Sequence, residues 1–222
     1  MIDTSEVKVV VFDLDRTLVP TDLEKIFFNI VIPMYISGRK GICYENARKL
    51  FYDELERLKE TSEALFFSLE AISQVTGIKY DDLIKILSEL CHICVKPYPY
   101  VVETLKFLKK KGIKIVVLTD TDAAIALHKV NAAGISKFIE KIISATEIFG
   151  SRKNSYIYQK LFEFLKALDY VSDKKQILVV GDDIERDYNM PRQAGLQALL
   201  LSKKKVVPES IRSLKDLISL FK

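Results

Sequence analysis

Two aspartates separated by one residue follow a hydrophobic run near the amino terminus. The run VVVF occupies residues 9–12, and Asp13 and Asp15 come directly after it in the sequence DLDRT. Carboxylates serve as nucleophiles, as proton donors and acceptors, and as ligands of hard metal ions. Capping of the next helix would use only one such side chain, so it explains the pair poorly. We therefore treat both aspartates as candidates for chemistry.

Further polar side chains stand where later strands are expected to end. In open α/β sheets the ligand site lies beyond the carboxyl ends of the strands, so these side chains are expected to converge with Asp13 and Asp15. Four of them end the runs IKIVVLTD and QILVVGDD, a fifth follows the second run, and a lysine precedes the helical run SYIYQKLFEFLKALD. The groups are Thr119, Asp120, Lys153, Asp182, Asp183 and Asp187.

Several carboxylates gathered at one edge of a sheet would repel one another and raise each other's pKa unless a cation shared them. A hard divalent ion with oxygen ligands is the natural counterion. Mg²⁺ keeps part of its water shell and suits a phosphate substrate. We therefore expect Mg²⁺ as the cofactor.

The elements that must position these groups alternate between strand and helix patterns. Nearly continuous apolar runs predict buried parallel strands at residues 7–12, 113–120, 141–144, 176–183 and 196–201. Apolar residues three and four apart predict helices at 123–134, 155–169 and 187–195. This alternation predicts an α/β fold with a doubly wound, Rossmann-like parallel sheet.

One long interval breaks the alternation. Helical patterns at residues 21–38, 44–60, 63–77 and 80–90 separate the first strand from the second. A crossover needs only about a dozen residues, so the interval predicts an inserted all-helical subdomain. We expect a core of residues 1–20 and 97–222 and a helical cap of residues 21–96.

Four motifs resemble, in order and in strand context, the signature motifs of the haloacid dehalogenase-like (HAD) hydrolase superfamily. They are FDLDRTL, VVLTD, a lysine at the start of the next helix and VVGDDIERD, and the match extends over residues 9–195. The segment KPYPYVVETLKFLKKKG resembles the return from a helical cap to the core. The resemblance implies a magnesium-dependent phosphohydrolase that acts on a small phosphorylated metabolite through an aspartyl-phosphate.

The resemblance also implies a role for each matching residue. Asp13 would attack phosphorus, and Asp15 would protonate the leaving alcohol and later take a proton from water. The Asp13 carboxylate, the Asp15 backbone carbonyl and Asp182 would hold Mg²⁺. Thr119 and Lys153 would bind the transferred phosphoryl oxygens. Two further acids would orient water and the lysine, namely Asp183 and Asp187.

Three positions depart from the superfamily pattern. Arg16 stands where a small or short polar residue is common, and it is expected either to reach an anionic substrate or to pair with an acid of the core. Asp120 replaces a frequent asparagine or glycine, and its charge is unfavourable beside a phosphate unless it points away. Both are included among the substrate-binding candidates. Asn154 follows Lys153 where proline is common, so Lys153 is assigned by position, with Lys160 as the other candidate.

Three other classes of protein remain open. A dehalogenase of the same superfamily would displace halide, but members with that activity resemble this pattern without the second aspartate. A response-regulator receiver is about half this length and carries its phosphate acceptor on a later strand. A non-catalytic binding protein with the same fold would have little use for the complete set of motifs.

Composition narrows the partners and the location. Lysines mostly alternate with glutamates in a chain of formal charge +4, so no basic stripe for nucleic acid is expected. No apolar run approaches the roughly 18 residues of a membrane helix, and the amino terminus lacks a signal-peptide pattern. We expect a cytoplasmic monomer or homodimer without membrane contact. Cys91 and Cys94 form a CxxC pair without a partner pair, so we expect a packing role.

The cap is expected to select the substrate. Its first two predicted helices meet near several cations and tyrosines, which could face the cleft. We expect one or more of these cations to contact the non-reacting end of the substrate, namely Arg39, Lys40 or Arg48.

Overall fold

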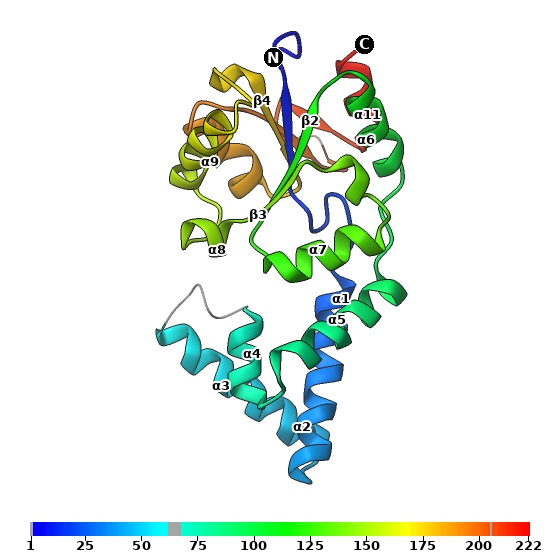
Figure 1. The fold of residues 1–222 in the computed structure, drawn as a ribbon, viewed down its shortest axis with the longest axis vertical. Coiled ribbons are helices and arrows are strands. Elements are labelled where there is room, and N and C mark those ends of the chain that lie inside the picture. The colour runs from blue at the N-terminus through cyan, green and yellow to red at the C-terminus, as the bar shows by residue number, and fades with distance from the viewer. Residues whose placement is uncertain (1, 62–67, 205) are drawn as a thin grey trace.

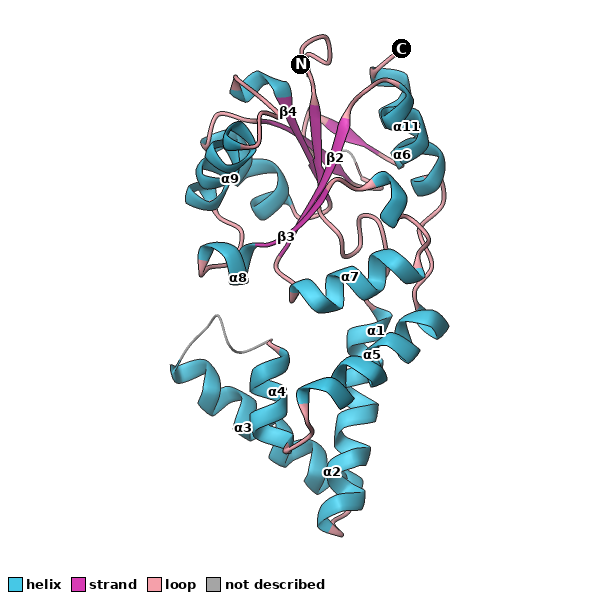
Figure 2. Cartoon of the chain, viewed as in Figure 1, coloured by secondary structure: helices cyan, strands magenta, loops and turns pink. Residues whose placement is uncertain are grey.

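A parallel sheet lies at the centre of the computed structural model, which describes residues 2–61, 68–204 and 206–222 (Figure 1; Figure 2). Six strands within these residues follow the order β3-β2-β1-β4-β5-β6. Their bounds are Val9–Phe12 (β1), Lys114–Thr119 (β2), Lys141–Ser144 (β3), Ile177–Gly181 (β4), Gln197–Leu201 (β5) and Ser210–Ile211 (β6). The predicted α/β fold with a doubly wound sheet is confirmed, and the short β6 extends it beyond the prediction.

Both faces of the sheet are buried, and successive strand residues contribute to them in turn because their side chains point to opposite sides. Val10 and Phe12 join one apolar core, and Val9 and Val11 join the other. Helices α6 (Val101–Lys110), α7 (Ala123–Ala132) and α11 (Leu214–Leu220) cover the first face. Helices α9 (Ser155–Ala167) and α10 (Met190–Gln193) cover the second, with the π-helix η4 (Ile184–Asn189). Helix α8 (Ala145–Phe149) follows β3, and short 3₁₀ turns occupy Ser136–Phe138 and Lys174–Gln176.

The helical insertion lies beyond the carboxyl ends of the strands (Figure 1). Its first helix runs from α1 (Asp22–Ile26) through the π-helix η1 (Phe27–Val31) to α2 (Ile32–Lys40), close to the predicted bounds. Helices α3 (Tyr44–Thr61), α4 (Leu69–Thr76) and α5 (Tyr80–Cys94) complete it. None of the helices in the described ranges is both long and apolar enough to cross a membrane.

Of the helix predicted over residues 63–77, the structure describes residues 68–77. Helix α4 begins at Leu69, because Ser68 is extended and its hydroxyl accepts a hydrogen bond from the backbone N–H of Ala71. An N-cap of this kind marks the beginning of a helix. Residues 62–67, with Phe66 and Phe67, lie outside the described ranges.

The entry and the exit of the insertion lie side by side. The backbone N–H of Tyr98 donates to the carbonyl of Leu18 over 3.0 Å. Side chains of the insertion and of the sheet share one apolar cluster, in which Leu23 and Phe27 join Leu14. The insertion is therefore joined to the core by packing as well as by two connecting segments.

Gly181, the last residue of β4, provides a test of the close packing of Asp187 against the end of this strand. A Cβ at this position would lie 2.4 Å from Cγ of Asp187. We expect Gly181→Ala to lower the free energy of unfolding by about 1–3 kcal/mol in urea denaturation, because Asp187 or the strand must shift.

The matched control is Gly38→Ala in α2, where an added Cβ would meet no atom within 4 Å. This variant should be neutral or more stable by about 0.5–1 kcal/mol, because alanine favours a helix. Equal stability of Gly181→Ala and the parent protein would contradict the close approach.

Candidate active site

The register of the three central strands brings the predicted site residues together. Phe12 of β1 pairs with Val117 of β2 and with Val180 of β4, so these three strands end within two residues of one another. A cavity of about 240 Å³ opens there. Its lining includes every site residue predicted from the sequence, namely Asp13, Asp15, Arg16, Thr119, Asp120, Lys153, Asp182, Asp183 and Asp187.

Lys153 lies at the bottom of this cavity between two carboxylates. Its Nζ donates to Oδ1 of Asp13 and to Oδ1 of Asp187, each over 2.6 Å. Asn154 accepts from the backbone N–H of Ile157 and so begins helix α9, which fixes the preceding lysine. The neighbouring carboxylates raise the pKa of Lys153 although burial opposes this effect. Lys153 therefore provides a fixed positive charge beside Asp13.

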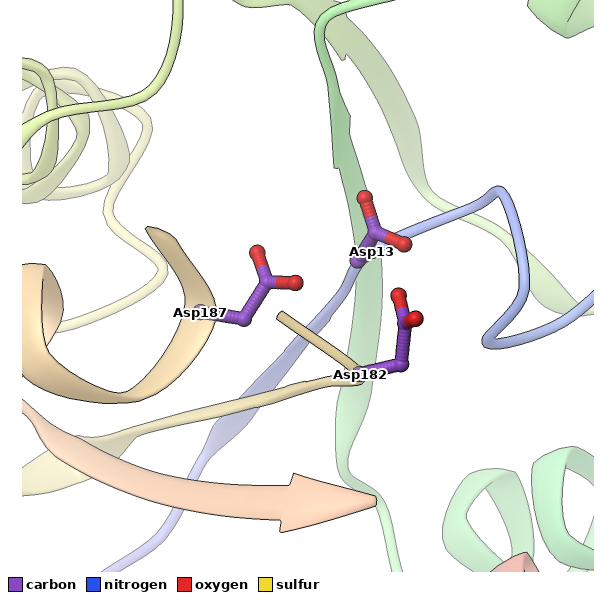
Figure 3. A group of neighbouring side chains, drawn as sticks. All are labelled: Asp13, Asp182 and Asp187. Atoms are coloured by element: carbon purple, nitrogen blue, oxygen red, sulfur yellow. The ribbon is translucent and has the colours of Figure 1, made fainter. Parts of the chain in front are cut away.

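Three carboxylates converge in the same cavity. One oxygen from each of Asp13, Asp182 and Asp187 lies within 4.8 Å of the others, and Figure 3 shows the side chains turned toward one another. Burial raises the pKa of Asp13 to about 7, although Lys153 opposes this shift. Burial also raises the pKa of Asp182. Crowded, buried oxygen ligands of this kind fit a hard divalent cation.

Asp187 is more engaged with protein than the other two carboxylates. Besides Lys153, it accepts from the hydroxyl of Tyr158 over 3.5 Å and from the backbone N–H of Asp183 over 3.1 Å. We therefore keep Asp13 and Asp182 as the candidate side-chain ligands. Asp187 is better placed to hold Lys153, as the sequence predicted.

Arg16 pairs with an acid of the core, which is one of the two alternatives that the sequence left open. Its Nε lies 3.1 Å from Oδ2 of Asp182, and about half of the Arg16 side chain is exposed. The residue adopts a φ of 64°, in the left-handed region that favours glycine. A tight turn after β1 imposes this conformation, because the Arg16 N–H donates to the carbonyl of Val19 over 2.7 Å.

Asp120 is surrounded by donors, which explains how its charge can lie near a phosphate site. Oδ1 accepts from the backbone N–H of Lys153 over 2.7 Å. Oδ2 accepts from Arg186 over 3.1 Å and from Arg152 over 3.4 Å. In this arrangement Asp120 organises the loop of Lys153, and its contact with a substrate stays a prediction.

Asp183 has no hydrogen bond to Lys153, and its expected role in orienting water stays a prediction. Its Oδ1 accepts from the backbone N–H groups of Glu185 and Arg186, which begins η4. Its Oδ2 pairs with the guanidinium of Arg186, and these contacts lower the pKa of Asp183 to about 2 despite its partial burial. Asp183 is thus a cap at the rim of the cavity.

Asp15 is held by two residues that the sequence analysis missed. Oδ1 accepts from Nζ of Lys129 over 2.5 Å, and Oδ2 accepts from the hydroxyl of Thr121 over 2.7 Å. Lys129 also pairs with Glu24 of α1. The signal was present, because Lys129 interrupts the apolar face of α7 four residues after Ile125.

A second cavity of about 560 Å³ lies between the sheet and the helical insertion. It shares five lining residues with the smaller cavity, namely Asp15, Thr21, Asp120, Thr121 and Arg152. The insertion contributes Glu24, Lys25, Phe28, Ser68 and Glu70, and the core contributes Asp122, Ile125, Thr146 and Glu147. Outside the shared residues the charged groups are therefore mostly acidic.

The cations expected to contact the substrate lie elsewhere. Arg39 donates to the backbone carbonyls of Thr76 and Gly77, and the Arg48 guanidinium lies over the ring of Tyr52. Neither these residues nor Lys40 line the larger cavity. The expectation was wrong because it placed the junction of the first two cap helices toward the core, whereas α2 extends away from the sheet (Figure 1).

Comparison with known proteins identifies the class. The chain matches the haloacid dehalogenase-like hydrolase family over residues 7–195, and it belongs to that family.

The similar proteins include a glyceraldehyde 3-phosphate phosphatase of Methanocaldococcus jannaschii, which is 26% identical over 90% of this chain and 86% of its own length. A phosphorylated carbohydrates phosphatase of Thermotoga maritima is 23% identical over 86% of this chain and 82% of its own. The crystal structure of a HAD phosphatase from Thermococcus onnurineus has a TM-score of 0.74 at 19% identity, covering 96% of this chain and 97% of the other. The last comparison supports the fold alone.

The carboxylate cluster leads to a test by metal binding. We expect Mg²⁺ at about 100 times its Kd to stabilise the protein by about 2.7 kcal/mol, or roughly 5–10 °C in Tm. With a pKa of about 7, Asp13 is mostly protonated at pH 6 and mostly ionised at pH 8, so the apparent Kd should be about tenfold weaker at pH 6.

Neighbouring residues provide the matched control for this measurement. Asp182→Asn should abolish the thermal shift, whereas Asp183→Asn should retain most of it, because only Asp182 belongs to the cluster. Equal loss in the two variants would refute the proposed ligand set.

Proposed function

We propose that this protein is a magnesium-dependent phosphatase of small phosphorylated carbohydrates and that it forms an aspartyl-phosphate on Asp13. Residues 21–96 serve as its cap. The observation that carries the proposal is the place of Asp15, which lines both cavities. The smaller cavity, with Asp13 and Lys153, suits a phosphoryl group, and the larger cavity suits the remainder of the substrate.

The proposed reaction has two displacements. In the first, an Asp13 oxygen bonds to phosphorus while the bond from phosphorus to the substrate oxygen breaks, and Asp15 donates a proton to that oxygen. In the second, a water oxygen bonds to phosphorus, Asp15 takes the proton of that water, and the Asp13–phosphorus bond breaks to release phosphate. Lys153 and Thr119 stabilise the equatorial phosphoryl oxygens.

Mg²⁺ bound by Asp13 and Asp182 would supply screening of the negative charges on nucleophile and substrate. The protein already contributes part of this screening. Lys153 contacts Asp13 directly, and Arg16 contacts Asp182. These cations favour the approach of a phosphate dianion to an otherwise acidic site.

The larger cavity and the relatives agree on the kind of leaving group. Among the residues that the structure describes, four acids line that cavity outside the shared residues, namely Glu24, Glu70, Asp122 and Glu147, against the single cation Lys25. Such a lining repels a carboxylate and accepts hydroxyl donors. The relatives from Methanocaldococcus jannaschii and Thermotoga maritima carry the names of phosphatases of glyceraldehyde 3-phosphate and of phosphorylated carbohydrates. Both features support a hydroxylated, uncharged leaving group.

A dehalogenase is the alternative within the family. Halide leaves without a proton, so that reaction gives no role to Asp15 as a proton donor. Release of halide from a 2-chloroacid, measured beside release of phosphate from nitrophenyl phosphate, separates the two activities.

Asp13→Asn tests the central assignment. The amide has nearly the same shape but is a poor nucleophile, so kcat for nitrophenyl phosphate should fall on the order of 10³-fold or more. Thermal unfolding should show a folded variant, because the substitution removes a charge from a crowded site. Parent-like turnover by folded Asp13→Asn would exclude the aspartyl-phosphate mechanism.

Matched substrates test the leaving-group preference. We expect kcat/KM for glycerol 3-phosphate or glyceraldehyde 3-phosphate to exceed that for 3-phosphoglycerate by about tenfold or more, because the latter brings a carboxylate to an acidic cavity. Glu70→Gln should narrow this ratio and leave nitrophenyl phosphate hydrolysis nearly unchanged. A preference for 3-phosphoglycerate would contradict the reading of the cavity.

A further inference from the structure

A fully buried lysine, Lys129, contacts Asp15 and has no part in the reaction proposed above. Its side chain has no exposed area, and the other buried residues of α7 are the apolar Ile125, Ala126 and Val130. Burying an ammonium group costs several kcal/mol unless close partners compensate, and a well-packed apolar residue is often as stable. The position therefore calls for an explanation beyond folding.

Two carboxylates from different parts of the chain share this ammonium. Asp15 follows β1 and accepts from Lys129 over 2.5 Å, while Glu24 belongs to α1 of the insertion. Burial lowers the pKa of Lys129, and Asp15 opposes that shift. The ammonium thus joins the edge of the sheet to the first helix of the cap.

The same contacts fix the direction of the Asp15 side chain. Lys129 donates to one carboxylate oxygen and Thr121 donates to the other, so rotation of the carboxylate would break at least one short hydrogen bond. A carboxylate has about four acceptor positions, so two donors leave positions at which Asp15 can carry the proton that it gives to the leaving group. The free positions can face the two cavities that Asp15 lines.

We propose that Lys129 is a positioning residue that holds the Asp15 carboxylate at the junction of the two cavities and, through Glu24, links this orientation to the docking of α1. The inference rests on the proposed phosphatase function. It adds that proton transfer to the leaving group requires α1 to be docked. The Lys129 ammonium group thereby couples proton transfer to the leaving group with the docking of helix α1.

Lys129→Met tests the proposal, because methionine has similar length and volume without the charge. We expect kcat for an alkyl phosphate, whose leaving group needs a proton, to fall at least about tenfold more than kcat for nitrophenyl phosphate. A loss by the same factor for both substrates would overturn the positioning role. Absence of phosphatase activity in the parent protein would instead refute the proposed function itself.

A double-mutant cycle distinguishes action through Asp15 from a separate effect. In the Asp15→Asn background, Lys129→Met should change the remaining alkyl phosphatase activity by less than about twofold, because the group that it positions is already impaired. Multiplicative losses would show independent effects and contradict the proposal.

Two further variants keep the test decisive if Lys129→Met does not fold. Thr121→Val removes the other donor to Asp15 and should give the same difference between alkyl and nitrophenyl substrates. Glu24→Gln should raise KM for glycerol 3-phosphate by a larger factor than it lowers kcat for nitrophenyl phosphate. Lys109→Met is the control, because Lys109 pairs with Glu140 outside both cavities. If both site variants behaved like this control, the proposal would be wrong.

Discussion

Repulsion among carboxylates at one end of the sheet is the constraint on which the rest of the site depends. Asp13, Asp182 and Asp187 lie close enough to share a cation, and burial raises the pKa of Asp13 and of Asp182. The chain meets this constraint by bringing cations from distant segments. Lys153 precedes α9, Arg16 lies in the turn after β1, and both pair with members of the cluster.

The parallel sheet creates this constraint and also makes it useful. Strands that are paired in register must end at the same edge, so residues far apart in sequence become neighbours there. Both faces of the sheet are covered by helices, so the open edge is where a ligand can approach. Acids that would weaken the fold elsewhere are thus gathered where a metal ion and a phosphate can balance them.

The sequence was sufficient for the sheet and for the residues at its edge. Runs such as VVVF and ILVVG are too apolar for an exposed strand, and Asp13 and Asp182 follow them directly. It was insufficient for contacts set by tertiary structure. The partners of Asp15 come from α7 and from the segment between β2 and α7. Only the direction in which α2 leaves the sheet removes Arg39 and Arg48 from the cleft. Asp183 could not be told from Asp187 by spacing, since which one reaches Lys153 depends on the turn that begins η4.

The hydrogen bond between Leu18 and Tyr98 has a consequence for how such a chain can change. The two ends of the insertion meet, so the insertion connects two neighbouring points of the core as a short loop would, whatever the number of residues between those ends. The entropy of closing a loop grows only slowly with its length. Lengthening, shortening or exchanging these helices therefore costs the sheet little, and the lining of the larger cavity can change while the edge that holds Asp13 stays fixed. Lys129 sets a limit to this freedom, since any replacement must still present an acid to it where Glu24 now lies.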